Sequence, residues 1–234
     1  MEIRAIGTWS SKLSRNKRNT SYLINNNILI DCGPHTAESL INNSIKISNI
    51  DIILISHMHL DHYGGLPELI WQRAFESTDK KIIIIGPDDI EKRTYNILNE
   101  YYTPDYFKKN IEFNKRFDNI IIGNGKHSIN DYTYKLKLDK TLFYTGDTSY
   151  SEEVIRDGYN SDIFIHEATY PSDVEDIAVK YGHSTVNDAY KSFKLSKSKI
   201  FIPTHMSELS LNEIRKINDD NIIIPEENEK YVIT

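Results

Sequence analysis

Cysteine is almost absent from this chain: among its 234 residues, Cys32 is the only one. A single cysteine excludes an internal disulfide and is typical of a reducing compartment. The chain also lacks any apolar run approaching the roughly 18 residues that a membrane helix needs, and residues 1–4 do not open a secretory signal. We therefore expect a cytoplasmic protein that does not bind a membrane.

Linkers, repeats and low-complexity segments are missing as well. Hydrophobic residues make up 39% of the chain and charged residues 26%, which is the composition of a globular protein. The length suits one large domain with a substantial core. We place a single domain over residues 1–234.

Excess positive charge is also lacking. The formal net charge is −6, so no global basic field attracts nucleic acid, which is not the partner we expect. The exception is the basic segment 12–18, with Lys12, Arg15, Lys17 and Arg18. This segment is either a solvated surface loop or an RNA-binding segment.

Apolar runs alternate with helical patterns along the whole chain, which predicts an α/β protein with two sheets flanked by helices. The strands 21–24 and 28–31 are joined by an asparagine turn at 25–27, and the strands 132–138 and 141–144 by a turn at 139–140. The other predicted strands cover residues 3–6, 52–55, 81–85, 120–122, 162–165, 200–203, 222–224 and 231–233. Helices are predicted over residues 36–43, 66–77, 88–101, 151–157, 184–195 (with Ser184 as the cap) and 207–217.

Three of the eight histidines fall between positions 57 and 62, directly after the apolar run 52–55. His57, His59, Asp61 and His62 would stand on one loop at the end of a strand. Imidazole nitrogens and carboxylate oxygens suit zinc or another borderline transition ion. His57 and His59 diverge on a helix but share one side of an extended backbone. The cluster predicts a metal site, and the alternative is a solvated histidine-rich loop.

Three later residues also stand at the exits of apolar runs. His127 follows the glycine-marked segment 123–125, Asp147 follows the strand 141–144, and His205 follows the strand 200–203. A lone histidine at such a place is usually structural. Together with the first cluster, the three residues make a larger metal-ligand set, because strand-end loops gather at one edge of a sheet.

The sequence resembles the metallo-β-lactamase fold superfamily over essentially the whole chain. The pattern of that superfamily is, in order, a strand-end Asp, the motif H-x-H-x-D-H, a His, an Asp and a His. The resemblance implies an αββα sandwich of two mixed β-sheets flanked by helices, and two divalent ions, zinc with manganese or cobalt as alternatives. Two such ions would change the net charge from −6 to about −2 and make a local positive focus, which suits a small anionic substrate. In the family's pattern Asp31 braces the metal loop, and Asp147 bridges the ions. One ion would be held by His57, His59 and His127, and the other by Asp61, His62 and His205. True β-lactamases often carry a metal-ligating cysteine that has no counterpart here. We therefore do not expect β-lactamase activity.

Two further motifs, at residues 166–169 and 182–185, resemble those of ribonuclease Z-type phosphodiesterases, as do residues 7–8 and 86–87. The resemblance implies that His183 protonates the departing oxygen, that Glu167 orients His183, and that Asp61 steers the attacking hydroxide. His166 would lie behind the metal ligands, or is merely a satisfied strand-end histidine. His183 has a plain alternative too, as a residue that starts a helix.

The substrate prediction depends on a missing segment. In tRNA-processing relatives a protruding arm can be inserted between the third-motif histidine and the bridging aspartate, whereas here the hairpin 132–144 fills most of the gap between His127 and Asp147. Compact relatives include 3′,5′-cyclic-nucleotide phosphodiesterases, among them phage-encoded anti-Pycsar enzymes that open cyclic pyrimidine nucleotides and act in the host cytoplasm. By this resemblance we expect a homodimer that hydrolyses cCMP, cUMP, cAMP or cGMP.

Candidate substrate contacts lie in two places. Tyr101 and Tyr102 offer rings for stacking a base, or form a surface cluster or dimer contact, and Ser184 and Thr185 adjoin His183. Three other functions stay open. They are a tRNA 3′-processing endoribonuclease that lacks the arm, a thioester or lactone hydrolase, and a metal-stabilised binding module without activity.

Overall fold

The structure is a computed structural model that describes residues 1–12, 14–76 and 79–234. Contacts within the chain divide it into two compact units. Unit 1 comprises residues 1–7, 15–116 and 227–234, and unit 2 comprises residues 8–14 and 117–226. Each unit has a sheet and a hydrophobic core of its own. The single domain expected over residues 1–234 therefore stays a prediction.

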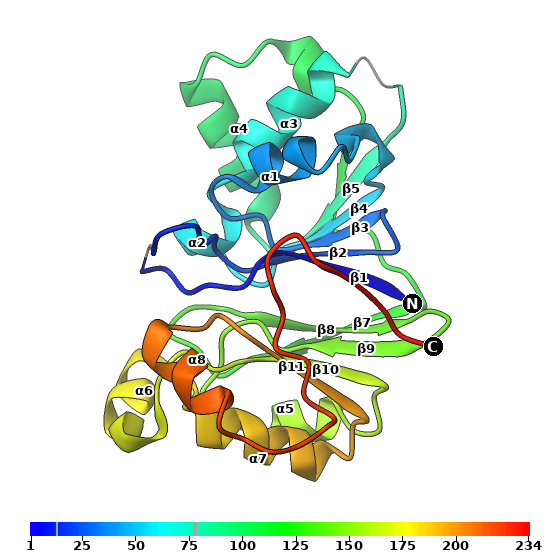
Figure 1. Ribbon diagram of the computed structural model, residues 1–234. Coiled ribbons are helices and arrows are strands. Elements are labelled where there is room, and N and C mark those ends of the chain that lie inside the picture. The colour runs from blue at the N-terminus through cyan, green and yellow to red at the C-terminus, as the bar shows by residue number, and fades with distance from the viewer. Residues whose placement is uncertain (13, 77–78) are drawn as a thin grey trace. The chain divides into compact units, whose positions relative to one another are not determined.

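Unit 1 contains a seven-stranded mixed sheet in the order β12-β1-β2-β3-β4-β5-β6 (Figure 1). The strands β12, β1, β2 and β3 pair antiparallel, whereas β3, β4, β5 and β6 pair parallel. Asn25 and Asn26, both with positive φ, form the predicted turn between β2 and β3. The strands are β1 (Glu2–Gly7), β2 (Ser21–Ile24), β3 (Ile28–Ile30), β4 (Ile52–Leu54), β5 (Ile82–Ile85), β6 (Ile111–Phe113) and β12 (Lys230–Val232).

The helices α1 (Thr36–Asn42), α3 (Leu66–Phe75) and α4 (Ile90–Glu100) gather beside this sheet (Figure 1). Their apolar faces and the sheet enclose one core, in which Leu29, Ile53, Leu69 and Ile84 are fully buried. Pro67 stands in the first turn of α3, as predicted. The remaining short elements are α2 (Leu60–Tyr63), η1 (Ile47–Asn49) and η2 (Asp105–Lys108).

Unit 2 contains a five-stranded mixed sheet in the order β11-β10-β9-β8-β7. The strands β9, β10 and β11 are parallel, and β7, β8 and β9 are antiparallel neighbours. The carboxyl ends of β7, β9, β10 and β11 therefore share one edge of the sheet. The strands are β7 (Ile120–Asn124), β8 (Tyr132–Lys137), β9 (Thr141–Tyr144), β10 (Ile163–Glu167) and β11 (Ile200–Thr204).

Four helices and a short 3₁₀ turn complete unit 2. Ser151 caps α5, Thr185 caps α7 and Ser207 caps α8, each accepting a backbone N–H from the first turn. Phe143, Phe164 and Phe193 anchor the core. The elements are α5 (Glu152–Asp157), η3 (Ser172–Val174), α6 (Glu175–Tyr181), α7 (Val186–Ser196) and α8 (Glu208–Ile214). No helix within the described residues has both the length and the apolar composition that a membrane crossing requires.

Several sequence predictions differ from the structure. The cap of α7 is Thr185 and not Ser184, because Asp188 completes a capping box with Thr185. The predicted strand 222–224 is wrong: only Ile222 pairs, as an isolated bridge to Phe201. The helices α2 and α6 and the strand β6 were not predicted. The predicted end of a helix at residue 77 lies outside the described residues.

Candidate metal centre

His57 and His59 follow β4, where Ile55 still donates its N–H to the Ile85 carbonyl at 2.8 Å and prolongs the parallel pairing. The Nε2 atom of His57 lies 3.0 Å from Nδ1 of His59. Two nitrogens bound to one tetrahedral zinc ion at about 2.0–2.1 Å would lie about 3.3 Å apart. The extended backbone therefore turns both imidazoles to one side, as predicted, with a separation that suits a shared metal ion.

Asp61 and His62 stand on the short helix α2 and not in the predicted loop. His62 Nε2 lies 3.6 Å from Asp61 Oδ2, again a separation for two ligands of one ion. The helix packs tightly on the strand-end segment 31–33, since the Cys32 N–H donates to the His62 carbonyl at 2.7 Å. A side chain at Gly33 would lie 2.1 Å from the Asp61 carbonyl oxygen, so this approach requires glycine.

Asp31 braces this half of the centre. Its Oδ1 accepts the Ser56 N–H at 2.7 Å, and its Oδ2 accepts the Ser56 hydroxyl at 2.9 Å. Since that hydroxyl donates to Asp31, it accepts from His57 Nδ1, 3.0 Å away. In the neutral ring, His57 Nε2 then carries no hydrogen. Asp31 itself has a φ of 55°, a strained conformation for a residue with a side chain. Ser56 was not predicted.

In unit 2, His205 follows β11 with a φ of 51°, and its Nε2 lies 3.5 Å from Asp147 Oδ2. His127 follows β7, and its Nδ1 donates to the Gly182 carbonyl at 2.7 Å. Burial lowers the pKa of His127, which favours the neutral imidazole that a metal ligand must be. Ligand atoms of His127, Asp147 and His183 all lie within 4.8 Å of one another.

Asp131, which the sequence analysis missed, supports the loop that carries Asp147. Asp131 is buried, and its Oδ1 accepts the Asp147 N–H at 3.3 Å. A side chain at Gly125 or Gly146 would lie 2.3 Å or 2.5 Å from the Asp131 carboxylate, so both turns need glycine to close around it. The glycines in the sequence were the available signal, because they mark where the backbone approaches another group closely.

Glu167 and His183, the two residues of the predicted acid, are in contact: Oε1 of Glu167 lies 2.9 Å from Nδ1 of His183. Glu167 is fully buried and also accepts the Thr148 N–H at 2.9 Å. Burial alone would raise the pKa of Glu167, but the charge on His183 and its hydrogen bond hold that pKa below its usual range. The His183 ring stacks on the His205 ring, with centroids 5.3 Å apart.

Three predicted residues serve the framework of unit 2. His166 is buried, stacks on Phe164 and donates from Nδ1 to the Glu167 carbonyl at 2.7 Å, as a satisfied strand-end histidine does. Ser184 donates its hydroxyl to the Thr148 carbonyl at 2.6 Å. The Thr185 hydroxyl serves the capping box of α7. These contacts engage the Ser184 and Thr185 hydroxyls within the protein, and the predicted substrate contact of both residues stays a prediction.

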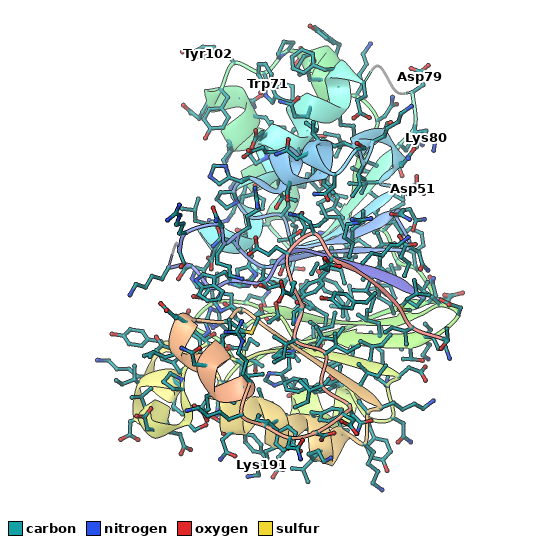
Figure 2. All side chains as sticks on the ribbon, viewed as in Figure 1. Asp51, Trp71, Asp79, Lys80, Tyr102 and Lys191 are labelled. Carbon is teal, nitrogen blue, oxygen red and sulfur yellow. The ribbon has the colours of Figure 1, made fainter. Side chains whose placement is uncertain are left out.

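Tyr101 and Tyr102 follow α4 in unit 1, where Figure 2 labels Tyr102 on the outside. Tyr102 is 92% exposed and Tyr101 62% exposed. Tyr101 lines a cavity of about 390 Å³ together with Met58 and Leu60, which alternate along the chain with the metal-site histidines. Tyr101 thus remains a candidate for contact with a substrate, whereas Tyr102 does not line this cavity.

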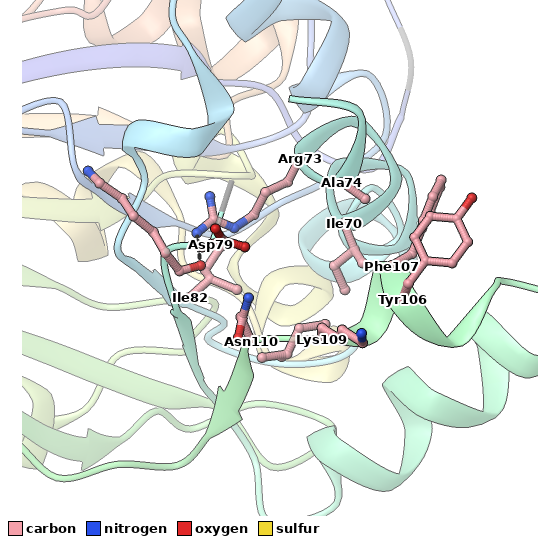
Figure 3. Close-up of a pocket in the computed structure, with 11 residues that line it drawn as sticks. Ile70, Arg73, Ala74, Asp79, Ile82, Tyr106, Phe107, Lys109 and Asn110 are labelled. Carbon is pink, nitrogen blue, oxygen red and sulfur yellow. Dashed lines mark hydrogen bonds between the residues drawn. The ribbon is translucent and has the colours of Figure 1, made fainter. Parts of the chain in front are cut away.

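A second cavity, of about 280 Å³, lies at the amino ends of β5 and β6 in unit 1 (Figure 3). It is lined by Ile82 and Ile111, the first residues of β5 and β6, whereas the metal-site histidines follow the carboxyl end of β4. Arg73 is buried in its wall and donates to the Lys80 carbonyl at 2.8 Å. The cavity contains no predicted metal ligand and is separate from the candidate centre.

The donor set of each unit fits a divalent metal. Unit 1 brings together ring nitrogens and a carboxylate at 3.0 to 3.6 Å, and unit 2 places His205 Nε2 3.5 Å from Asp147 Oδ2. Several of these imidazoles are hydrogen-bonded through Nδ1, an arrangement found behind metal-binding histidines. The chain therefore has side chains able to bind a divalent metal.

The fold is that of the metallo-β-lactamase superfamily. The crystal structure of human tRNase Z, short form (ELAC1), is similar with a TM-score of 0.84 and 20% sequence identity, covering 100% of both chains. The metallo-beta-lactamase fold protein YhfI from Bacillus subtilis is similar with a TM-score of 0.81 and 18% identity, covering 98% of both chains. The prediction of two mixed sheets flanked by helices is confirmed.

Sequence similarity assigns the chain to a narrower family within this fold. Residues 1–178 match the family described as anti-Pycsar protein Apyc1, and the chain belongs to it. The chain is also 27% identical to the ribonuclease Z of Listeria monocytogenes over 271 residues and 29% identical to that of Saccharolobus islandicus over 264 residues. Each match covers 88% of this chain and 89% of the relative. The prediction of a metal-dependent phosphodiesterase on this fold is confirmed.

Proposed function

We propose that this protein hydrolyses 3′,5′-cyclic nucleotides such as cCMP and cUMP to 5′-nucleotides, with cAMP and cGMP as further candidates. In a virus, such an enzyme would degrade a bacterial antiviral signal in the host cytoplasm. Membership of the anti-Pycsar family supports the substrate class. The bond between Glu167 and His183 is the observation that carries the chemistry, because a cyclic phosphodiester has a poor ribose leaving group.

The ligand order along the chain and the family resemblance support a centre with two ions, zinc in the first instance. We assign His57, His59 and His127 to one ion. Asp61, His62 and His205 would hold the other, with Asp147 between the two. When bound, two such ions supply a hydroxide nucleophile near neutral pH and neutralise charge on the phosphoryl oxygens. Asp61 would orient the attacking oxygen.

His183 is our candidate general acid. Its Nδ1 donates to Glu167, so its other ring nitrogen, Nε2, carries the transferable proton toward the leaving 3′ oxygen. The buried carboxylate favours the imidazolium that must exist before the transfer. A positioned general acid contributes about 10²–10⁴-fold to such a reaction.

RNA is the second candidate substrate, because the relatives that match most of this chain are ribonucleases Z. The expectation that nucleic acid is not a partner has no support from them. The arm used by some tRNA-processing relatives is absent between His127 and Asp147, where the described residues form only β8, β9 and their connections. This absence keeps a small substrate as our first proposal. The homodimer remains a proposal by resemblance, and the cytoplasmic location remains a proposal from the sequence.

One experiment separates these functions. The zinc-loaded protein is incubated with the four 3′,5′-cyclic mononucleotides, cyclic dinucleotides, a precursor tRNA and nitrophenyl esters, and the products are resolved by chromatography. We expect 5′-nucleotides from at least one cyclic mononucleotide, with cCMP or cUMP preferred. Cleavage of the tRNA alone would replace this proposal with the ribonuclease, and turnover of esters alone would indicate a thioester or lactone hydrolase.

A further inference from the structure

Thr169 lies two positions beyond β10, at the centre of the unit 2 cluster. Its hydroxyl oxygen lies 2.5 Å from Glu167 Oε2 and 2.8 Å from His205 Nδ1. The same oxygen lies 3.4 Å from His183 Nδ1. Thr169 is only 9% exposed, so water does not replace these contacts readily.

The directions of these hydrogen bonds follow from the groups involved. The ionised Glu167 carboxylate only accepts, so Thr169 gives its single hydroxyl hydrogen to Oε2. The hydroxyl must then accept from His205, which requires a hydrogen on Nδ1 of that ring. His205 Nε2 is thereby left with its lone pair, and Nε2 is the atom that lies 3.5 Å from Asp147.

Hydrogen bonds to β11 and to the start of α8 fix the backbone that carries the Thr169 hydroxyl. The strands β10 and β11 run parallel with Glu167 opposite Thr204, and the Ala168 N–H donates to the Thr204 carbonyl at 2.8 Å. The Ser207 hydroxyl donates to the Thr169 carbonyl at 2.8 Å. The backbone around Thr169 is therefore bonded to residues 204 and 207, which precede and follow His205 in the chain.

We propose that Thr169 is a positioning residue that selects the Nδ1–H form of His205, so that Nε2 faces the metal, and couples this ligand to the Glu167–His183 pair. One carboxylate then orients both a metal ligand and the general acid. The roles of His205 and His183 rest on the proposed function, whereas the hydrogen-bond directions rest on the contacts alone.

Removal of the hydroxyl without change of shape tests the inference. In Thr169→Val the His205 ring loses its Nδ1 acceptor, and either ring nitrogen can then carry the hydrogen. Partners behind a metal-binding histidine are worth about 10–100-fold in metal affinity. We expect zinc binding, measured by competition with a chromophoric chelator, to weaken by that factor in Thr169→Val. Thr169→Ser keeps the hydroxyl and should restore wild-type affinity.

Ser196→Ala is the matched control. Ser196 is buried at the end of α7 and donates its hydroxyl to the Phe193 carbonyl at 2.7 Å, so the variant loses a comparable bond outside the cluster. It should retain zinc affinity. Equal affinity in Thr169→Val and wild type overturns the proposal, as does equal weakening in Thr169→Val and Ser196→Ala.

A second measurement does not need a folded variant. Nitrogen-15 NMR of the histidines in the metal-free wild-type protein at mildly alkaline pH reports which ring nitrogen carries the hydrogen. We expect Nδ1–H for His205, and an Nε2–H form overturns the proposal. If the protein binds zinc with this dependence on Thr169 but cleaves no phosphodiester, the proposed function fails and the positioning role stands.

Discussion

Asp31 and His62 form a buried pair: Oδ2 of Asp31 lies 2.8 Å from Nδ1 of His62, and both side chains are 0% exposed. Because the carboxylate accepts, His62 donates from Nδ1, and its Nε2 carries no hydrogen in the neutral ring. His57 is held in the same way through Ser56. Both imidazoles thus carry their hydrogen on Nδ1, which is the form in which a histidine can bind a metal ion through Nε2.

We expect Asp31→Asn to weaken zinc binding by about 10–100-fold, the usual effect of losing such a partner. Three donors point at this carboxylate, two from Ser56 and one from His62, so an amide nitrogen there would face a donor. The measurement is chelator competition. Asp51→Asn is the control, because the Asp51 carboxylate accepts a long, 3.3 Å bond from the Asn27 side chain. Unchanged affinity in Asp31→Asn would refute the bracing role.

Asp147→Ala should abolish phosphodiester hydrolysis. Asp147 stands between the unit 2 ligands, and its carboxylate lies 3.5 Å from His205 Nε2. Its loss removes the proposed link between the two ions, which supply the larger share of the rate enhancement. Initial rates are measured at saturating zinc, with Asp157→Ala, a half-buried carboxylate at the end of α5, as the control. Activity within tenfold of wild type would exclude the bridging role.

His183→Ala should show a dependence on the leaving group. For a ribose leaving group we expect about 10²–10⁴-fold loss in kcat, the contribution of a general acid. Bis-nitrophenyl phosphate has a leaving group that needs no proton, so its hydrolysis should fall far less. Equal losses on the two substrates would mean that His183 acts in some way other than proton donation.

Much of this arrangement was predictable from sequence, because strands and ligand residues carry local signals. The turn at Asn25 is one example, and the placement of the His57 and His59 rings on one side of the strand end is another. The helix α2 was missed because its four residues include Asp61 and His62 and show no apolar period. Contacts between strands leave no such signal. The role of Thr169 depends on which strand lies beside β10, and one hydroxyl in the sequence does not reveal that.

Stability should respond to pH through Asp219. The Asn221 N–H at 3.0 Å and the Tyr190 hydroxyl at 2.8 Å hold the pKa of Asp219 well below its usual range. A depressed pKa in the folded state stabilises the protein above the unfolded pKa of about 3.9, and this stabilisation is lost as pH falls. Asp219→Asn should therefore lower Tm at pH 7, with a smaller difference near pH 3. A Tm difference that grows on acidification would contradict this assignment.

The basic segment 12–18 distinguishes the two candidate substrates. Arg18 is engaged within unit 1, where its N–H donates to Glu227 at 2.7 Å and its guanidinium lies 3.5 Å from the same carboxylate. Lys12 and Arg15 are exposed. We expect the double variant Lys12→Glu, Arg15→Glu to leave cyclic-nucleotide hydrolysis unchanged, because a small substrate is bound at the metal centre. Long RNA would instead be held by such charges, with binding that weakens steeply as salt increases. Loss of precursor-tRNA cleavage in the variant, together with a steep salt dependence in the wild type, would show that RNA is a substrate of the protein and that segment 12–18 binds it.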